Sequence, residues 1–116
     1  MVLGPEELVR QLMISYLIGF KNYNKNKIAV EKELKLLERK KRFDILIYDS
    51  AMSPHILIEC KAPEVPITQN TFEQISRYNL ELNAPFLIVT NGITTYCCEV
   101  FVEGGNYKFL NEVPNF

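Results

Sequence analysis

The hydrophobic pattern centres on two short apolar runs, residues 45–47 and 56–58. Every position in them is Ile or Leu, which is typical of strands buried on both faces. The turn-prone residues 50–53 between the runs predict a hairpin. A third apolar run, residues 86–90, predicts another buried strand, and the Asn91-Gly92 dipeptide that follows predicts a tight turn.

Two segments show helical spacing instead. The segment Gly4–Glu7 begins the first, because Pro suits the first helical turn and acidic residues suit the positive end of the helix dipole. This helix is expected to end near residue 19. A second helix, capped by Thr68 or Asn70, is expected to run to about residue 82. The apolar face expected for the first helix contains Val9, Leu12, Met13, Tyr16, Leu17 and Phe20.

Residues 28–37 alternate loosely with a period of two, which predicts an edge strand, although residues 30–40 also fit a helix. Residues 39–41 are expected to form a turn into the central hairpin. Residues 94–102 and 107–113 predict a final hairpin. The elements then follow the order α-β-β-β-α-β with a C-terminal β-hairpin, which is an α/β fold with a mixed sheet flanked by helices.

The bulk properties are those of one soluble domain spanning residues 1–116. No apolar run approaches the roughly 18 residues that a membrane helix needs, so no membrane contact is expected. The N-terminus lacks the basic segment of a secretory signal. The three cysteines show no disulfide framework. We therefore expect a cytoplasmic protein.

The charge is unevenly distributed, although the net charge is only −1. Residues 21–42 carry nine basic and three acidic side chains, whereas the rest of the chain carries four basic and eleven acidic ones. Such a basic arm suits contact with phosphates. A solvated strand with its flanking loops explains the same counts equally well.

Three charged residues flank the central strands and require an explanation. Glu59 and Lys61 are two apart on a strand, so they leave the same face of the sheet, and a hairpin can place Asp44 beside Glu59. Two close carboxylates repel each other unless a cation lies between them, and Mg²⁺ prefers such oxygen ligands. A neighbouring Lys can activate a water for attack on phosphorus. The alternative is an ion pair of Lys61 with either carboxylate at the end of the sheet.

This pattern resembles the PD-(D/E)xK nuclease superfamily, and more closely the N-terminal nuclease domain of type I restriction enzyme R subunits. Phe43 stands where the superfamily pattern has Pro. The likeness covers about residues 5–92. The features that carry it are Pro5–Gln11, Arg42-x-Asp44, Glu59-x-Lys61-Ala62-Pro63, Gln74-Ile75-Ser76-Arg77-Tyr78, Asn83-Ala84-Pro85 and Thr90-Asn91-Gly92.

The resemblance implies a restriction-endonuclease-like core with a catalytic site made of Asp44, Glu59 and Lys61. Asp44, Glu59 and the main-chain carbonyl of Cys60 would bind Mg²⁺, with Mn²⁺ as a substitute, and Lys61 would position and activate the water. An acidic residue of the first helix would also face the metal, with Glu7 as first choice and Glu6 as second. Both acids are equally explained as partners of the helix dipole.

The resemblance also implies a role for the second helix. Gln74 and Tyr78 share one helical face and would contact DNA or support the catalytic residues, and Arg77 and Arg42 are further candidates. A half-buried Tyr with a solvated Gln explains the pair equally well.

The function expected is therefore that of a Mg²⁺-dependent endodeoxyribonuclease acting on double-stranded DNA. Partners implied by the resemblance are helicase and specificity or methylation subunits of a restriction complex, because the chain has no phosphate-binding loop of its own. The alternative is a non-catalytic module that keeps the nuclease fold and binds nucleic acid or a partner.

Overall fold

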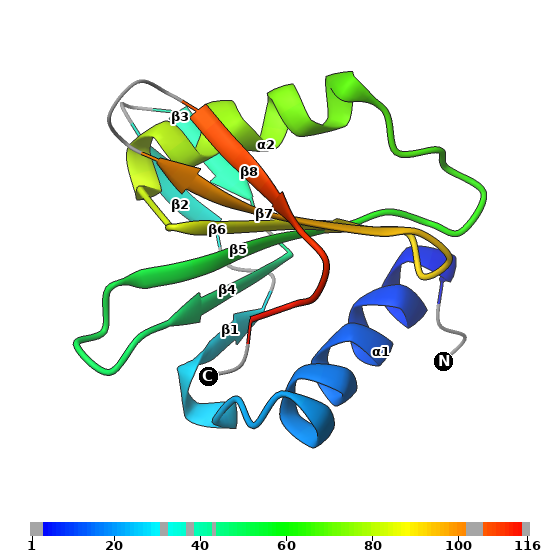
Figure 1. The fold of residues 1–116 in the computed structure, drawn as a ribbon, viewed down its shortest axis with the longest axis horizontal. Coiled ribbons are helices and arrows are strands. Elements are labelled where there is room, and N and C mark those ends of the chain that lie inside the picture. Colours follow the sequence, from blue (N-terminus) through cyan, green and yellow to red (C-terminus); the bar gives the residue numbers. More distant parts are fainter. Residues whose placement is uncertain (1–3, 31–32, 37–38, 43, 102–105, 115–116) are drawn as a thin grey trace.

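A computed structural model describes residues 4–30, 33–36, 39–42, 44–101 and 106–114, with side chains described for all of these except 33–36, 39–42 and 81. This part of the chain contains two helices, the first followed by five strands and the second by three (Figure 1). In chain order the elements are α1 (Pro5–Phe20), a 3-10 turn η1 (Lys25–Lys27), β1 (Ile28–Val30), β2 (Glu33–Leu36), β3 (Arg39–Arg42), β4 (Ile45–Tyr48), β5 (Pro54–Cys60), α2 (Gln69–Leu82), β6 (Phe86–Thr90), β7 (Thr95–Phe101) and β8 (Asn106–Leu110).

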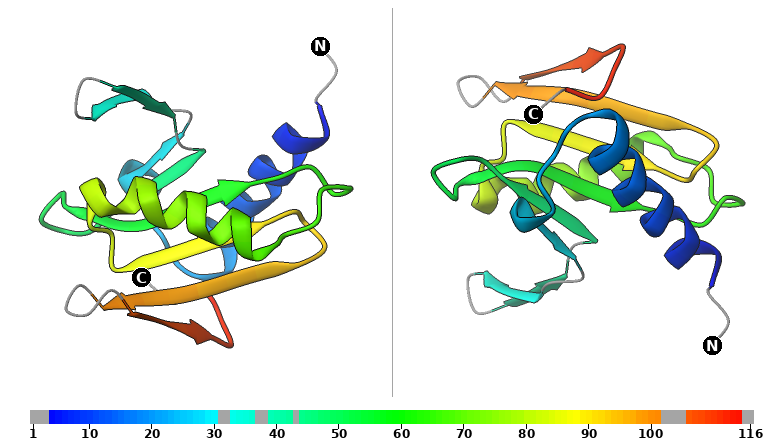
Figure 2. Two further views of the ribbon diagram at one scale, coloured as in Figure 1. Left: turned by 90° about the horizontal axis from the view of Figure 1, so that it is seen from above. Right: turned by 90° about the horizontal axis from the view of Figure 1, so that it is seen from below.

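The main sheet has six strands in the order β1-β4-β5-β6-β7-β8. All neighbours are antiparallel except β5 and β6, which are parallel and joined by α2 as the crossover that parallel strands require. Helix α1 covers one face of the sheet and α2 the other (Figures 1 and 2). The predicted α/β fold with a mixed sheet, the central hairpin and the terminal hairpin is confirmed.

The basic segment before the central hairpin differs from the prediction. The expected edge strand is limited to β1 in the main sheet, where Ile28 pairs with Ile47. Strands β2 and β3 instead pair with each other as a separate two-stranded sheet, with Leu36 opposite Arg39. The predicted turn at 39–41 is therefore wrong, because that segment is in β3. An alternating pattern indicates a strand but does not say with which strand it pairs.

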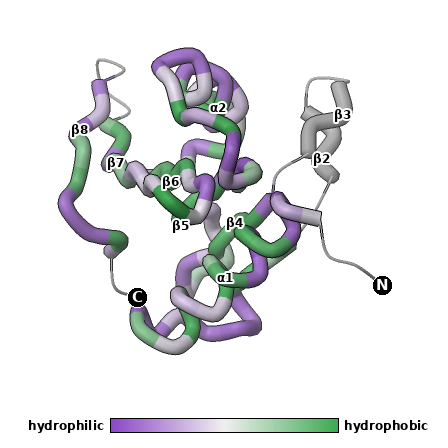
Figure 3. Tube along the Cα trace, turned by 90° about the vertical axis from the view of Figure 1, so that its right-hand side faces the viewer, coloured by the Kyte–Doolittle hydropathy of each residue, from purple (hydrophilic) through white to green (hydrophobic). Residues whose placement is uncertain are grey.

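Two apolar layers lie on opposite faces of the sheet. Alternate residues of β4 and β5, such as Ile45 and Ile58, pack under α1, whereas Leu46 and Leu57 pack under α2. Figure 3 shows the hydrophobic residues concentrated along these central strands. The strands are therefore buried on both faces, as their continuous apolar runs predict.

The apolar face of α1 is narrower than its spacing suggests. Val9, Met13 and Leu17 are buried, but Leu12 is 58% exposed and Phe20 is 80% exposed. The inclusion of these last two in the buried face is therefore wrong, since they lie beyond the stripe that reaches the sheet. None of the described helices is long and apolar enough to cross a membrane.

Helix α2 is fixed at both ends by local hydrogen bonds. At its start, the Thr68 main-chain N–H donates to the Thr71 hydroxyl (3.2 Å), which confirms Thr68 rather than Asn70 as the cap. At its end, Asn83 adopts a left-handed conformation with φ 55°. The buried Asn79 side chain exchanges two hydrogen bonds of 2.9 Å with the main chain of Ala84. These contacts set where the chain leaves α2 and enters β6.

Candidate active site

Asp44 and Glu59 face each other across the first central hairpin. In the β4–β5 ladder Ile45 pairs with Ile58, so continuing the antiparallel register by one residue places Asp44 opposite Glu59. Asp44 is the residue that precedes β4, and Glu59 is the last but one residue of β5. The hairpin register therefore brings together two carboxylates from consecutive strands.

The carboxylate of Asp44 is held by groups from two elements. Its Oδ2 accepts a hydrogen bond of 2.8 Å from the main-chain N–H of Cys60. Its Oδ1 lies 3.9 Å from Nη1 of Arg10 on α1. The Asp44 side chain is only 16% exposed, so its position is determined by protein contacts more than by solvent.

Lys61 completes the cluster at the end of β5. Its Nζ lies 3.3 Å from Oε1 of Glu59, and both side chains retain some exposure, 29% and 21%. The main-chain N–H of Lys61 donates to the carbonyl of Thr90 (2.8 Å), which keeps Lys61 registered on β6 after β5 ends. The structure thus brings Asp44, Glu59 and Lys61 together, as their spacing suggests.

The two carboxylates perturb each other. Burial, followed by the nearby charge of Asp44, raises the pKa of Glu59 to about 7, although Lys61 acts in the opposite direction.

The thiol of Cys60, unlike its main-chain carbonyl, is not a candidate metal ligand. It is buried among the α1-side apolar residues, and burial raises its pKa to about 12, so it stays protonated. A metal could use the Cys60 carbonyl but not its thiolate.

The two acids at the start of α1 have different surroundings. Glu7 forms an ion pair with Arg10 and accepts a hydrogen bond from Gln11 Nε2 (2.9 Å). Glu6 is exposed, and its charge contributes to raising the pKa of both Glu59 and Cys60. Glu6 therefore acts electrostatically on the cluster, whereas Glu7 is already paired. The role of Glu7 as a metal ligand stays a prediction.

Among the described side chains around the cluster, acids outnumber bases. Glu6, Glu7, Asp44 and Glu59 lie near the basic side chains of Arg10 and Lys61, a formal excess of two negative charges among these described groups. A divalent cation would neutralise this excess and relieve the repulsion that raises the pKa of Glu59. Carboxylate and carbonyl oxygens are also the ligands that Mg²⁺ prefers. No group of three or more His, Cys, Asp or Glu side chains positioned to hold a metal occurs among the described residues, so the ligand set would be two carboxylates completed by main chain and water.

The predicted residues of α2 are less closely tied to this cluster. Gln74 and Arg77 are exposed, and Tyr78 is half-buried, packed against the apolar layer under α2. The side chain of Arg42 lies outside the described residues; its main chain ends β3, two residues before Asp44. The proposed roles of these four residues in DNA binding stay predictions.

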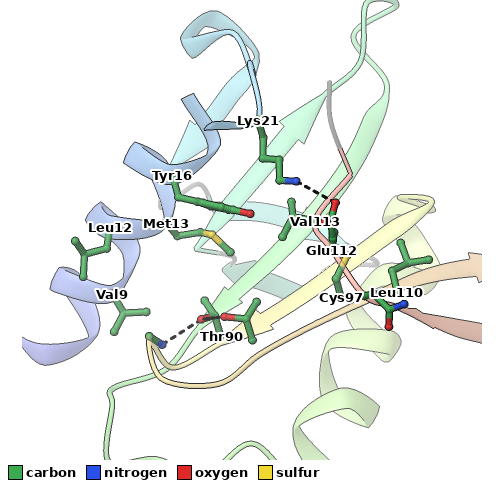
Figure 4. A pocket seen from close by; sticks show the side chains of 13 residues that line it. Val9, Leu12, Met13, Tyr16, Lys21, Thr90, Cys97, Leu110, Glu112 and Val113 are labelled. Carbon is green, nitrogen blue, oxygen red and sulfur yellow. Dashed lines mark hydrogen bonds and ion pairs between the residues drawn. The ribbon is translucent and has the colours of Figure 1, made fainter. Parts of the chain in front are cut away.

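A pocket lies away from this cluster. A cavity of about 440 Å³ opens between α1 and the strands β6 to β8, with Val9, Met13, Thr90, Cys97 and Val113 in its lining (Figure 4). Its lining includes none of the three cluster residues. We place the candidate active site at the carboxylates rather than in this cavity, because its lining offers no comparable group of acids.

The sequence analysis did not predict that two further residues near the site, Arg10 and Asn91, are buried and support it. Arg10 is buried and contacts both Glu7 and Asp44. Asn91 is buried, and its amide donates to the carbonyl of Val65 (2.9 Å) while its oxygen accepts from the N–H of Thr94 (2.7 Å). Asn91 thereby ties the loop after Lys61 to the β6–β7 turn. The sequence feature that could have indicated the burial of Arg10 is its position on the same side of the helix as Met13 and Leu17.

A comparison with protein families establishes the family of the chain. Residues 5–114 match the model of the type I restriction enzyme R protein N terminus. The chain belongs to this family. No match was found among curated proteins.

Solved structures show the same fold as this type I R protein N-terminal domain. A fragment assigned to the HsdR subunit of a type I restriction enzyme from Vibrio vulnificus YJ016 aligns over 99% of the chain with a TM-score of 0.69 and 20% identity. The chain spans only 24% of that protein chain. A protein from Anabaena variabilis ATCC 29413, assigned as a nuclease of the DUF820 group, aligns over 97% of this chain and 70% of its own, with a TM-score of 0.58 and 11% identity. The fold is therefore restriction-endonuclease-like.

Proposed function

We propose that this domain is a Mg²⁺-dependent endodeoxyribonuclease that hydrolyses phosphodiester bonds of double-stranded DNA. The observation that carries the proposal is the placement of Asp44 opposite Glu59 with Lys61 at 3.3 Å from Glu59. The family and the fold of the solved relatives support a nuclease-related role. The excess of acidic over basic groups among the described side chains around the cluster supports a divalent cation as the cofactor.

In this proposal the carboxylates of Asp44 and Glu59 and the main-chain carbonyl of Cys60 hold Mg²⁺, or Mn²⁺ in its place. When bound, the ion supplies Lewis-acid polarisation of the phosphodiester and makes an attacking water more acidic. Lys61 orients that water and stabilises negative charge that develops on the phosphate. The contact between Lys61 and Glu59 keeps the ammonium beside the cation site before substrate binds.

An acid of α1 would face the bound ion beyond the two carboxylates, because the described residues include no group of three acids positioned to hold a metal. Glu7, which forms an ion pair with Arg10, is the first candidate, and the exposed Glu6 is the second. Glu6→Gln and Glu7→Gln separate the two, because only the variant of the facing acid should weaken metal binding.

For substrate contact we propose the exposed residues Gln74 and Arg77, the half-buried Tyr78, and the basic arm that includes Arg42. Partners would be the helicase and the specificity or methylation subunits of a type I restriction complex. This part of the proposal rests on family membership and on the short span of the chain relative to the HsdR fragment.

The proposal is tested by incubating the domain with supercoiled double-stranded DNA in Mg²⁺ and, separately, in EDTA. Cutting in Mg²⁺, absent in EDTA and lost in Glu59→Gln, supports the nuclease. DNA binding without cutting, both alone and with its partner subunits, would contradict it and favour the non-catalytic binding module. Circular dichroism of Glu59→Gln controls for loss of the fold.

A further inference from the structure

Arg10 carries a full charge but is almost completely buried. Its side chain is only 9% exposed. On α1 it lies on the same side as Met13 and Leu17, both of which are buried in the apolar layer under the helix. Burying a guanidinium is costly unless acidic groups compensate for it, so the groups that surround it indicate what it does.

The acidic partners of Arg10 come from two different elements. One is Glu7, one turn earlier on α1, with which it forms an ion pair. The other is Asp44, which precedes β4 and whose Oδ1 lies 3.9 Å from Nη1 of Arg10. The two carboxylate side chains are 28% and 16% exposed, so solvent screens these interactions less than it would on an open surface. Arg10 therefore connects α1 to the candidate active site.

Arg10 and the main chain contact different oxygens of the Asp44 carboxylate. Cys60 N–H holds Oδ2 at 2.8 Å, while Arg10 lies beside Oδ1. At 3.9 Å the contact with Arg10 is an ion pair rather than a direct hydrogen bond. Together, the contacts with Cys60 N–H and with Arg10 hold the two oxygens of the Asp44 carboxylate from different elements.

We propose that Arg10 is a positioning residue, which holds the Asp44 carboxylate in the orientation that cation binding requires and ties the first helix to the site. The inference rests on the proposed function in so far as Asp44 serves as a metal ligand. Arg10 itself touches neither metal nor substrate in this account.

The chemistry of the side chain explains why this position holds Arg. A guanidinium is planar and presents several donors in a fixed arrangement, so it can serve two carboxylates at the same time. A Lys would retain the charge but offer a single point of contact. Arg10→Lys should therefore restore only part of what Arg10→Gln loses.

The test uses the metal-free protein first. Amide hydrogen exchange of Cys60 reports the Asp44–Cys60 hydrogen bond directly. In Arg10→Gln this exchange should be about tenfold faster, with Arg10→Lys intermediate. Lys108→Gln, a change at an exposed cation on β8, is the matched control and should leave the exchange unchanged. Titration with Mn²⁺ alone should then show an affinity about tenfold or more lower in Arg10→Gln, as for loss of other groups that orient ligands.

Equal Cys60 exchange and equal Mn²⁺ affinity in Arg10→Gln and Lys108→Gln would overturn the proposal. If Arg10→Gln does not fold, Arg10→Lys decides by the same two measurements, and values equal to those of the wild type refute the proposal. Failure of the wild type to bind Mn²⁺ would overturn the proposed function instead. In that case Cys60 exchange alone still decides whether Arg10 positions Asp44.

For a wild type that cuts DNA, the positioning role also predicts a kinetic separation. Arg10→Lys should lower kcat and raise the Mn²⁺ concentration needed for half-maximal cutting, while KM for DNA stays unchanged. A change in KM alone would contradict a role exercised through Asp44.

Discussion

Asp44 lies across the β4–β5 hairpin from Glu59, and the proximity of the two carboxylates helps to raise the pKa of Glu59 to about 7. This proximity lowers the stability of the metal-free folded protein and also places two potential oxygen ligands side by side. Without a cation, the two groups disfavour each other's charged forms. In the proposed function, a divalent cation would use the same two groups as oxygen ligands.

Asp44→Asn tests whether Asp44 is a ligand of the cation. Asn keeps an oxygen that can accept the hydrogen bond from Cys60 N–H but removes the charge, so the fold should survive while Mn²⁺ affinity falls by about tenfold or more. Isothermal titration with Mn²⁺ measures the affinity, and Asp49→Asn, in the turn after β4, is the matched control. Equal affinities in the wild type and Asp44→Asn would exclude Asp44 as a ligand.

Glu59→Gln tests whether the raised pKa of Glu59 makes the stability of the folded protein depend on pH. Because the pKa of Glu59 is raised from 4.5 to about 7 in the folded protein, the unfolded chain ionises first. The resulting loss of stability is absent below about pH 4.5, grows between the two pKa values, and is complete above pH 7. Its size is at most about 3 kcal/mol.

In metal-free buffer, Glu59→Gln should therefore match the wild type in Tm near pH 4.5 and exceed it at pH 8. Thermal unfolding at several pH values provides the comparison. Addition of Mg²⁺ at pH 8 should raise Tm of the wild type and not that of the variant. A difference in Tm that does not change with pH would contradict the assignment of the raised pKa.

The central hairpin and its charged ends could be predicted from sequence because few residues determine them. The apolar runs around Ile45 and Ile58 predict both strands, and pairing them as a hairpin brings Asp44 opposite Glu59, although a bulge between Ile47 and Tyr48 shifts the register next to the turn. Lys61 then follows from strand alternation. Local patterns were sufficient here because the paired strands are neighbours in the chain.

Long-range packing was not predictable in the same way. The period of two in residues 33–36 indicated a strand but not that β2 would pair with β3 away from the main sheet. The spacing of Leu12 and Phe20 fitted the apolar side of α1, but the sheet does not reach them. The burial of Arg10 was not predictable, because a charged residue in a helix is usually solvated and its partner Asp44 is distant in sequence.

Asn91 provides a prediction about the support of the site. Its buried side chain links Val65, in the loop after Lys61, to the N–H groups of Ile93 and Thr94. Asn91→Ala leaves these groups without their partner and should lower the free energy of unfolding by about 2 kcal/mol. Urea unfolding measures the loss, with Asn111→Ala at an exposed position as the control. Equal stability of the two variants would contradict this structural role.

The outer surface of α2 provides a prediction about DNA. Arg77→Ala should weaken binding uniformly across DNA sequences and reduce the salt dependence by about one phosphate contact. Because Arg77 and Gln74 are exposed, neither Arg77→Ala nor Gln74→Ala should change Tm. Fluorescence anisotropy at several salt concentrations, in EDTA to prevent cutting, measures the affinities. Salt slopes equal to those of the wild type would remove Arg77 from the proposed DNA surface.

The central claim is that Lys61, beside Glu59, takes part in metal-dependent hydrolysis of DNA. Its most direct test is the rate of cutting of supercoiled and linear DNA by the wild type and by Lys61→Ala, each with Mg²⁺ or Mn²⁺. We expect the wild type to cut, and Lys61→Ala to be slower by about 100-fold or more while it still binds Mn²⁺. Equal rates for the two proteins would contradict the assigned site.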